Sequence, residues 1–270
     1  MIRLIRGEVL KYRTLKSTWI LMASGAAVTL LIVFVILYGV ERNLGSGSGL
    51  SSGPTGTLQF GSSGWYPFTL ALSYTYSQLF GVVLGIICVT GEFRYNTASF
   101  TYLVEPRRSR VLYVKLIASA IWGLIYGVLA AILVTAFGVL LCSVWRLDPG
   151  AFLRNALTYL PVDVAGFVLF TLIGVGIGSL IHNQVLAIIS GVGMITIGAS
   201  LLALIGAIAP HIVPYLPQTA LMAFERVPQG GNRIIGGYRF LPWWGGGLVL
   251  LAYAAVLAGA GALTAQRSDL

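Results

Sequence analysis

The sequence predicts an all-α polytopic membrane protein, and three observations lead to that prediction. Of the 270 residues, 57% are hydrophobic and only 9% are charged, whereas a soluble domain carries about 25% charged residues. Apolar runs recur that are long enough to cross a hydrocarbon core, which takes about 20 helical residues. Eleven of the 17 Lys and Arg residues fall on one predicted side, as the positive-inside rule requires. We therefore expect six transmembrane helices with both termini in the cytoplasm.

The formal net charge of +9 would suggest nucleic-acid binding in a soluble chain. Here the positive-inside rule accounts for it, so we expect the lipid bilayer and no nucleic acid as a partner. The two cysteines, Cys88 and Cys142, lie near opposite membrane faces in this topology, and we expect them to remain free thiols.

Residues 1–18 form a basic leader in which Ile5, Val9 and Tyr12 share one helical stripe. This pattern predicts an amphipathic helix lying in the membrane interface, although a solvated leader that only sets topology is the alternative. The apolar run at 19–40 is too long for a cleaved signal peptide. It is predicted as span 1, a retained signal anchor.

Residues 43–64 contain seven Gly and six Ser, too little apolar surface to fold, which predicts a flexible, disordered external loop. An Asp148-Pro149-Gly150 turn is predicted in a second external loop, at 144–160. A tight cytoplasmic hairpin is predicted at 182–184. Residues 209–241 are rich in Pro and Gly, and we expect them to be the largest ordered external element. The remaining spans are expected at 68–91 (span 2), 111–143 (span 3), 161–181 (span 4), 185–208 (span 5) and 242–264 (span 6).

Small-xxx-small spacing recurs within the predicted spans and permits close approach of helix backbones. The pairs are Gly81 with Gly85, Gly123 with Gly127, and Gly174 with Gly178. We interpret each pair as ordinary internal packing.

Span 2 also holds an unusually polar cluster in its predicted outer half. Its members with a candidate role in a substrate path are Tyr74, Tyr76, Ser77 and Gln78. Polar groups in hydrocarbon are costly, so they should face a cavity, a neighbouring helix or another subunit. Hydrogen bonding between helices and a substrate-lining role both remain open.

Several kinds of chemistry are not supported by the sequence. No G-x-x-x-x-G-K-[ST] phosphate loop is present, so the chain is not expected to be an ATPase. We expect no catalytic nucleophile-base pair, and because His182 and His211 fall on opposite predicted sides, no metal site. Asp163 and Glu92 both fall near predicted span ends, which argues against buried charge pairs and disfavours an ion-coupled transporter; Asp163 keeps that class open.

The polar segment Gly91–Lys115 joins spans 2 and 3 on the cytoplasmic side. It reads GEFRYNTASFTYLVEPRRSRVLYVK, and its length and its aromatic residues favour a short helix that docks a partner. The pattern G-E-x-R-x-x-T followed by P-x-R-S-R and Lys115 resembles the membrane subunits of type-2 ATP-binding-cassette exporters, the drug, lantibiotic and polysaccharide class. Asn96 stands where that family usually has glycine, and the Gly/Ser insertion after span 1 is not part of its pattern.

The resemblance implies that residues 92–110 are the coupling helix, which sits in a groove of a separate ATPase subunit. The residues implied in this coupling are Glu92, Arg94, Thr97, Pro106, Arg107 and Arg110. The chain itself is expected to bind no cofactor, while ATP and magnesium are held by two copies of the ATPase. Six spans are half of such a transporter, so a homodimer or a heterodimer with a homologue is implied. Spans 1, 2 and 5 are implied to lie near the dimer interface and translocation path, and residues 209–241 are implied to be re-entrant helices.

The function implied is export of an amphipathic or hydrophobic compound, such as a drug, a peptide antibiotic or a lipid-like molecule, across a bacterial cytoplasmic membrane. The alternative is a non-transporting membrane scaffold or sensor that recruits a cytoplasmic partner through residues 92–110. The bland interpretation of the arginines, that they only satisfy the positive-inside rule, stays open for Arg108.

Overall fold

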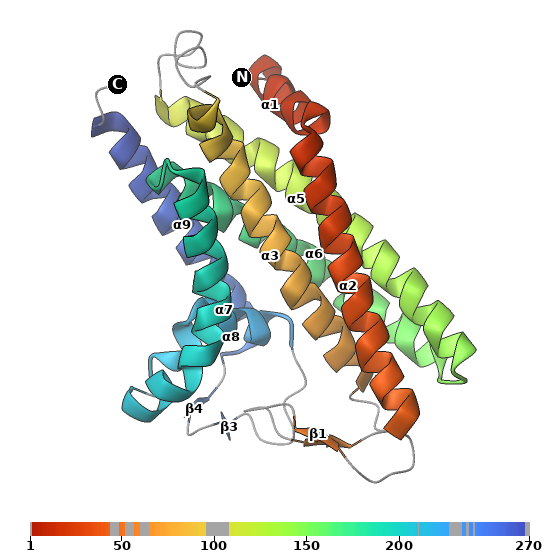
Figure 1. Cartoon of the computed structure of the whole chain (residues 1–270). Helices are drawn as coiled ribbons and strands as arrows, with labels where there is room; N and C mark the ends of the chain where they lie inside the picture. Colours follow the sequence, from red (N-terminus) through yellow and green to blue (C-terminus); the bar gives the residue numbers. More distant parts are fainter. Residues whose placement is uncertain are drawn as a thin grey trace.

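The computed structural model describes residues 2–43, 49–51, 57–59, 65–95, 108–209, 211–226, 234–235, 238–239 and 241–267. Within these ranges the chain is a bundle of long helices with two small antiparallel hairpins (Figure 1). Both chain ends lie at one end of the bundle, and the hairpins lie at the other (Figure 1).

Five helices are long and apolar enough to cross a membrane by length and composition. They are α2 (Lys16–Asn43), α3 (Trp65–Arg94), α5 (Arg108–Val144), α6 (Pro149–Leu180) and α9 (Trp243–Arg267). α2, α3 and α5 each contain a predicted span, and α6 and α9 each contain all but one residue of one, which is consistent with a polytopic membrane protein. The remaining predicted span, span 5 at 185–208, falls within α7 (Gln184–Ile208). Its described side chains form a shorter apolar stretch, Gln184–Thr196, so a sixth crossing stays a prediction.

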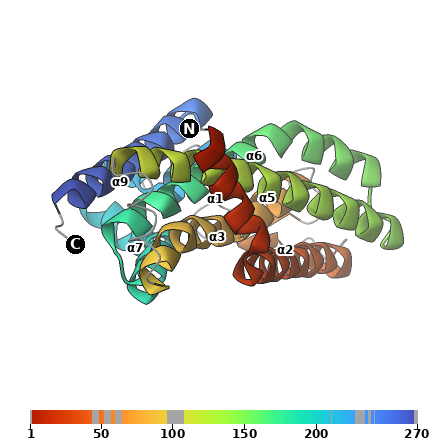
Figure 2. The same ribbon diagram turned by 90° about the horizontal axis from the view of Figure 1, so that it is seen from above.

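The N-terminal leader forms α1 (Ile2–Thr14), separated from α2 by the single non-helical residue Leu15. Seen from above, α1 lies across the end of the bundle (Figure 2). Glu8 and Tyr12 are buried, whereas Leu10 and Arg13 are exposed. The indole of Trp122 in α5 donates a hydrogen bond of 3.2 Å to the carbonyl of Val9. The leader is therefore a helix packed on the bundle through polar as well as apolar side chains.

The start of α6 differs from the predicted external loop at 144–160. Asp148 caps the helix by accepting a hydrogen bond of 3.0 Å from the Ala151 amide, and Pro149 occupies the first turn, where no amide donor is needed. Pro161, predicted to begin span 4, lies inside the same helix. The Asp-Pro-Gly sequence thus starts a helix, and only a short turn through Arg146, at φ 55°, separates α5 from α6.

The predicted tight hairpin at 182–184 is confirmed. α6 ends at Leu180, and α7 begins at Gln184 after a turn in which Asn183 accepts hydrogen bonds from the amides of Val185 and Leu186 at 3.0 and 3.3 Å. Cys88 and Cys142 are both free and buried.

Two predicted external segments contain regular structure where the chain is described. In the Gly/Ser segment, β1 (Gly49–Ser51) pairs with β2 (Thr57–Gln59); residues 44–48, 52–56 and 60–64 lie outside the described ranges. The later segment contains a 3₁₀ turn, η2 (Val213–Tyr215), and α8 (Pro217–Phe224). It ends in the pair β3 (Ile234–Ile235) and β4 (Tyr238–Arg239).

The interior divides into two hydrophobic clusters that share α3 and α6. One cluster joins these helices to α1, α2 and α5, and the other joins them to α7, α8 and α9. α3 and α6 approach closely because a glycine of each helix lies against the backbone of the other. A methyl group on Gly85 would overlap the Thr171 carbonyl, and a methyl group on Gly174 would overlap the Val82 carbonyl. The close approach predicted from the small-xxx-small pairs is confirmed at this crossing.

Gly85→Ala should destabilise the bundle, because its new methyl group would meet the α6 backbone. Overpacking of this kind costs about 1–3 kcal/mol. Gly259→Ala in α9 is the matched control, since nothing lies within 4 Å of its added methyl group. Unfolding of both variants in the same lipid discs should show a lower midpoint for Gly85→Ala and little change for Gly259→Ala. Equal midpoints would contradict the packing of α3 on α6.

Candidate functional site

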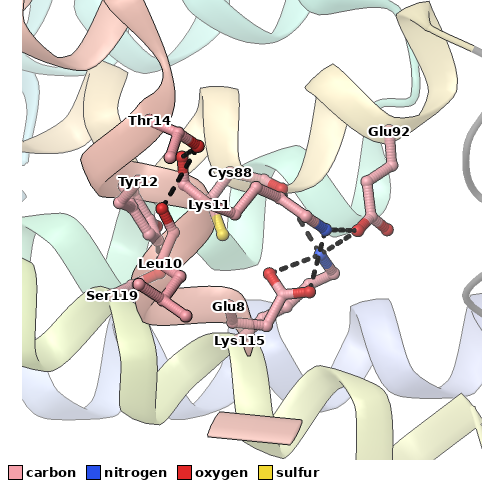
Figure 3. A network of polar contacts seen from close by, with 9 residues as sticks. All are labelled: Glu8, Leu10, Lys11, Tyr12, Thr14, Cys88, Glu92, Lys115 and Ser119. Carbon is pink, nitrogen blue, oxygen red and sulfur yellow. Dashed lines mark hydrogen bonds and ion pairs between the residues drawn. The ribbon is translucent and has the colours of Figure 1, made fainter. Parts of the chain in front are cut away.

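Four charged side chains from three helices meet at the end of the bundle where α1 lies. We call Glu8 and Lys11 of α1, Glu92 of α3 and Lys115 of α5 the charged cluster (Figure 3). Lys11 Nζ is 2.9 Å from Glu8 Oε1 and 2.5 Å from Glu92 Oε1. Lys115 Nζ is 2.8 Å from Glu92 Oε1 and 3.3 Å from Glu8 Oε2. Each ammonium group therefore lies between two carboxylates.

The position of each member of the charged cluster along its helix explains how the four side chains meet. Glu8 and Lys11 are three residues apart on α1, so they share one face. Glu92 lies in the last turn of α3, and Lys115 lies two turns into α5, where it is 3% exposed. Lys115 Nζ also lies 3.4 Å from the carbonyl oxygen of Cys88. Since two positive charges meet two negative charges, the charged cluster is neutral as a whole.

Burial makes this pairing a structural requirement. Glu92 is 5% exposed and Glu8 is 9% exposed, and an isolated charge at such a place would be strongly unfavourable. Burial and the Lys115 charge lower the pKa of Lys11, but the hydrogen bond to Glu92 and the charges of both carboxylates outweigh them and raise it overall. Lys11 consequently stays protonated at neutral pH, and α1 stays attached to α3 and α5.

Aromatic and hydroxyl groups surround the charged cluster on the α5 side. The hydroxyl of Tyr12 is 2.6 Å from Ser119 Oγ, and its ring stacks on Trp122 with centroids 5.7 Å apart. Burial raises the pKa of Tyr12 well above its usual value, so the phenol stays neutral. These contacts fix α1 against α5 over two further turns.

The two residues after Glu92 contact other elements. The ring of Phe93 packs edge-on against His182 in the α6–α7 turn, with centroids 4.3 Å apart. Arg94 Nη1 donates a hydrogen bond of 3.1 Å to Gln184 Oε1 at the start of α7. Three consecutive residues at the end of α3 therefore touch α1, α5, the α6–α7 turn and α7.

A pocket of about 500 Å³ opens beside the charged cluster. It lies between α1, the start of α2, the end of α3 and the first residue of α7. Leu21, Leu84 and Ile87 give it apolar walls, while Lys11 and Glu92 bring charge to it. Such a pocket suits a molecule with one polar end and one apolar body.

A second set of polar side chains is buried between α3, α6 and the residue that follows α8. Glu225 Oε1 accepts a hydrogen bond of 2.6 Å from Gln78 Nε2, and its Oε2 lies 2.9 Å from Thr75 Oγ1. Asp163 of α6 interacts electrostatically with Glu225. Glu225 and Asp163 are each 1% exposed. The expectation that Asp163 lies near a span end is wrong, because α6 begins at Pro149. The expectation of no buried charge pair is also wrong, because Glu92 and Lys115 form one at 2.8 Å.

The structure places some of the residues predicted to couple to an ATPase. Glu92 belongs to the charged cluster, Arg94 bonds Gln184, and Arg110 is half-buried in the first turn of α5. Thr97, Pro106 and Arg107 lie outside the described residues, as does most of the predicted coupling helix. The described part thus includes both points where this segment joins the bundle.

The residues predicted to line a substrate path separate into two groups. Tyr74, Ser77 and Gln78 are fully buried, and Gln78 is bonded to Glu225, as expected for hydrogen bonding within the bundle. Tyr76 is 44% exposed on the outer surface of α3. In this conformation Tyr74, Ser77 and Gln78 therefore face packed interior.

Sequence reasoning assigned no site role to Glu8, Lys11, Lys115 or Glu225. A signal for three of them was present: Glu8 and Lys11 share a helical face, and Lys115 stands inside an apolar helix, where a charge needs a partner. Nothing local marks Glu225, whose partners lie about 150 positions earlier in the chain. Across the residues that the structure describes, no group of three or more His, Cys, Asp and Glu side chains could hold a metal ion.

No protein-family model, curated protein or solved structure matches this chain. The geometry of the charged cluster, the pocket and the buried carboxyl groups is therefore the basis for the function proposed below.

Lys115→Met should destabilise the protein by about 3–5 kcal/mol, because two buried carboxylates would then share the single ammonium group of Lys11. Glu92→Gln together with Lys115→Met should recover part of that loss, since the remaining charges of Glu8 and Lys11 balance. Lys16→Met, at an exposed lysine, is the control. The free energy of unfolding in mixed micelles measures all three, and a loss no larger for Lys115→Met than for Lys16→Met would show that the charged cluster has no structural role.

Proposed function

We propose that this chain is the permease subunit of an ATP-driven exporter, energised by a separate ATPase that binds residues 92–110 on the cytoplasmic side. The observation that favours this most is the attachment of both ends of that segment to the charged cluster, through Glu92 at its start and Lys115 in the helix that follows it. A partner that displaces the segment would move α3 and α5 together. Because α1 is bonded to both, it would move with them.

The positions of the other elements support the same proposal. The charged cluster lies at the end of the bundle that holds both chain ends (Figure 1), and this is the end with the excess of basic residues. It is therefore the cytoplasmic end in the proposed topology. Five candidate spans are present, and α7 is proposed as the sixth.

The apolar walls and charged rim of the pocket favour an amphipathic or hydrophobic compound as the exported molecule. It lies between α2, α3 and the start of α7, which correspond to the three spans implied to lie near a dimer interface and translocation path. We propose that it is part of the cytoplasmic entrance. Displacement of α1 and α3 by the ATPase would narrow it, and opening at the hairpin end would complete alternating access.

The proposed partners follow from this mechanism. Two ATPase subunits supply ATP and magnesium, and a second permease copy, identical or homologous, completes the path. The chain itself performs no chemistry in this proposal. Glu92, Arg94, Thr97, Pro106, Arg107 and Arg110 are proposed to transmit movement from the ATPase.

The first test is whether a phosphate-loop ATPase is encoded beside this gene, and the second is co-expression of such an ATPase with the full chain. We expect the two to co-purify, and we expect the permease in lipid discs to stimulate ATP hydrolysis. Arg94→Glu with Arg107→Glu should reduce both, because these charges lie on the proposed docking segment. Arg154→Glu, an exposed arginine in the first half of α6, is the matched control and should change neither.

Retention of both complex and stimulation in the Arg94→Glu, Arg107→Glu variant would contradict the docking assignment. Co-purification without stimulation or transport would instead favour a membrane scaffold or sensor that recruits a partner through the same segment.

A further inference from the structure

The buried carboxyl groups of Asp163 and Glu225, which we call the carboxyl pair, lack the compensation that the charged cluster has. Both are 1% exposed. Among the residues that the structure describes, neither forms an ion pair with Lys, Arg or His. Arg226, the next residue in the chain, places its guanidinium over the ring of Trp243, 4.8 Å from the centroid. Within the described ranges, two negative charges at this site would therefore be opposed by neutral hydrogen-bond donors and by no ion pair.

The hydrogen count at Thr75 indicates where a proton is held. Its Oγ1 lies 2.9 Å from the carbonyl oxygen of Ala71 and 2.9 Å from Glu225 Oε2. A hydroxyl has one hydrogen to donate, and in a helix it commonly donates to the carbonyl four residues earlier. With Glu225 ionised, Thr75 must share this one hydrogen between two acceptors. With a proton on Glu225 Oε2, the carboxyl group donates to Thr75, and Thr75 donates to Ala71, so each contact has its own hydrogen.

Unpartnered buried oxygens point to the same site. Asp163 Oδ2 and Gln78 Oε1 make no hydrogen bond among the described residues, and Gln78 is fully buried with its amide nitrogen bonded to Glu225. Leaving a buried acceptor unpaired costs about 1–3 kcal/mol. A proton on Asp163 Oδ2 would remove a buried charge at an oxygen that has no partner among the described residues.

We propose that Asp163 and Glu225 form a proton-binding site that holds at least one proton at neutral pH and thereby keeps α8 seated against α3 and α6. Close carboxyl groups in a low-dielectric interior do not ionise together. Deprotonation leaves two charges in the interior and releases the segment that follows α7. The site lies on different residues from the charged cluster and is independent of any ATPase.

The titratable side chains around the carboxyl pair are consistent with a proton as its ligand. Tyr74 of α3 interacts electrostatically with both carboxyl groups, and Tyr159 of α6 interacts with Asp163 and Arg226. Both are phenols that are neutral near pH 7. Burial raises the pKa of Glu225 to about 8, with the contacts to Thr75 and Gln78 opposing the rise.

The direct test is the infrared C=O stretch of protonated carboxyl groups, recorded on the full chain in lipid discs. The difference between wild type and the Asp163→Asn, Glu225→Gln variant should show a protonated carboxyl band at neutral pH that is lost in strongly alkaline buffer. Both replacements keep side-chain size and polarity. Glu41→Gln, on the more exposed Glu41 at the end of α2, should give no such band. Absence of the band at neutral pH, with the variant folded by circular dichroism, would overturn the proposal.

Thermal unfolding gives a second readout. A carboxyl group with a raised pKa in the folded state favours folding at low pH, and this contribution is lost as pH rises from its usual pKa, near 4.5, to about 8. The unfolding midpoint of the wild type should therefore fall across that range more steeply than the midpoint of Asp163→Asn, Glu225→Gln. Parallel pH profiles would contradict a proton held by the carboxyl pair.

Discussion

The architecture depends on the balance of buried charges at the end of the bundle where α1 lies. Glu8, Lys11, Glu92 and Lys115 come from three helices and are separated by up to 107 positions in the sequence. Nevertheless, they form a neutral set in which each ammonium contacts two carboxylates (Figure 3). No member can move alone without leaving a buried charge unpaired. The charged cluster therefore makes α1, the end of α3 and the start of α5 behave as one body.

The carboxyl pair differs from the charged cluster because no ammonium or guanidinium group balances its buried carboxyl groups among the described residues. There, two acidic groups are buried without a basic partner among the described residues, and Glu225 contacts only the neutral side chains of Gln78 and Thr75 through the hydrogen bonds of its carboxyl group. A charge that is not balanced by a side chain is best balanced by a proton. The two sites thus balance buried charge in different ways: the charged cluster pairs ammonium groups with carboxylates, and the carboxyl pair is proposed to hold a proton.

Much of the helical plan could be predicted because apolar runs, glycine spacing and the His182–Gln184 break are local features. The start of α6 could not be placed from hydropathy, because Asp148 and Pro149 are both turn formers and favoured helix starters. The site was predicted only in part. Glu92 and Arg94 were identified from a motif, but their contacts with Lys11, Lys115 and Gln184 depend on how α1 and the α6–α7 turn pack. Glu225 was missed because its burial depends on α8 folding back against α3.

The central claim is that movement of the 92–110 segment reaches the pocket through the charged cluster. The most direct measurement is the rate of alkylation of a cysteine at Leu21, which lines the pocket, in a chain whose native Cys88 and Cys142 are replaced by serine. With the ATPase bound, we predict that trapping the complex with a non-hydrolysable ATP analogue slows alkylation, because the pocket narrows. Equal rates with and without the analogue, in a complex shown to bind it, would contradict the account.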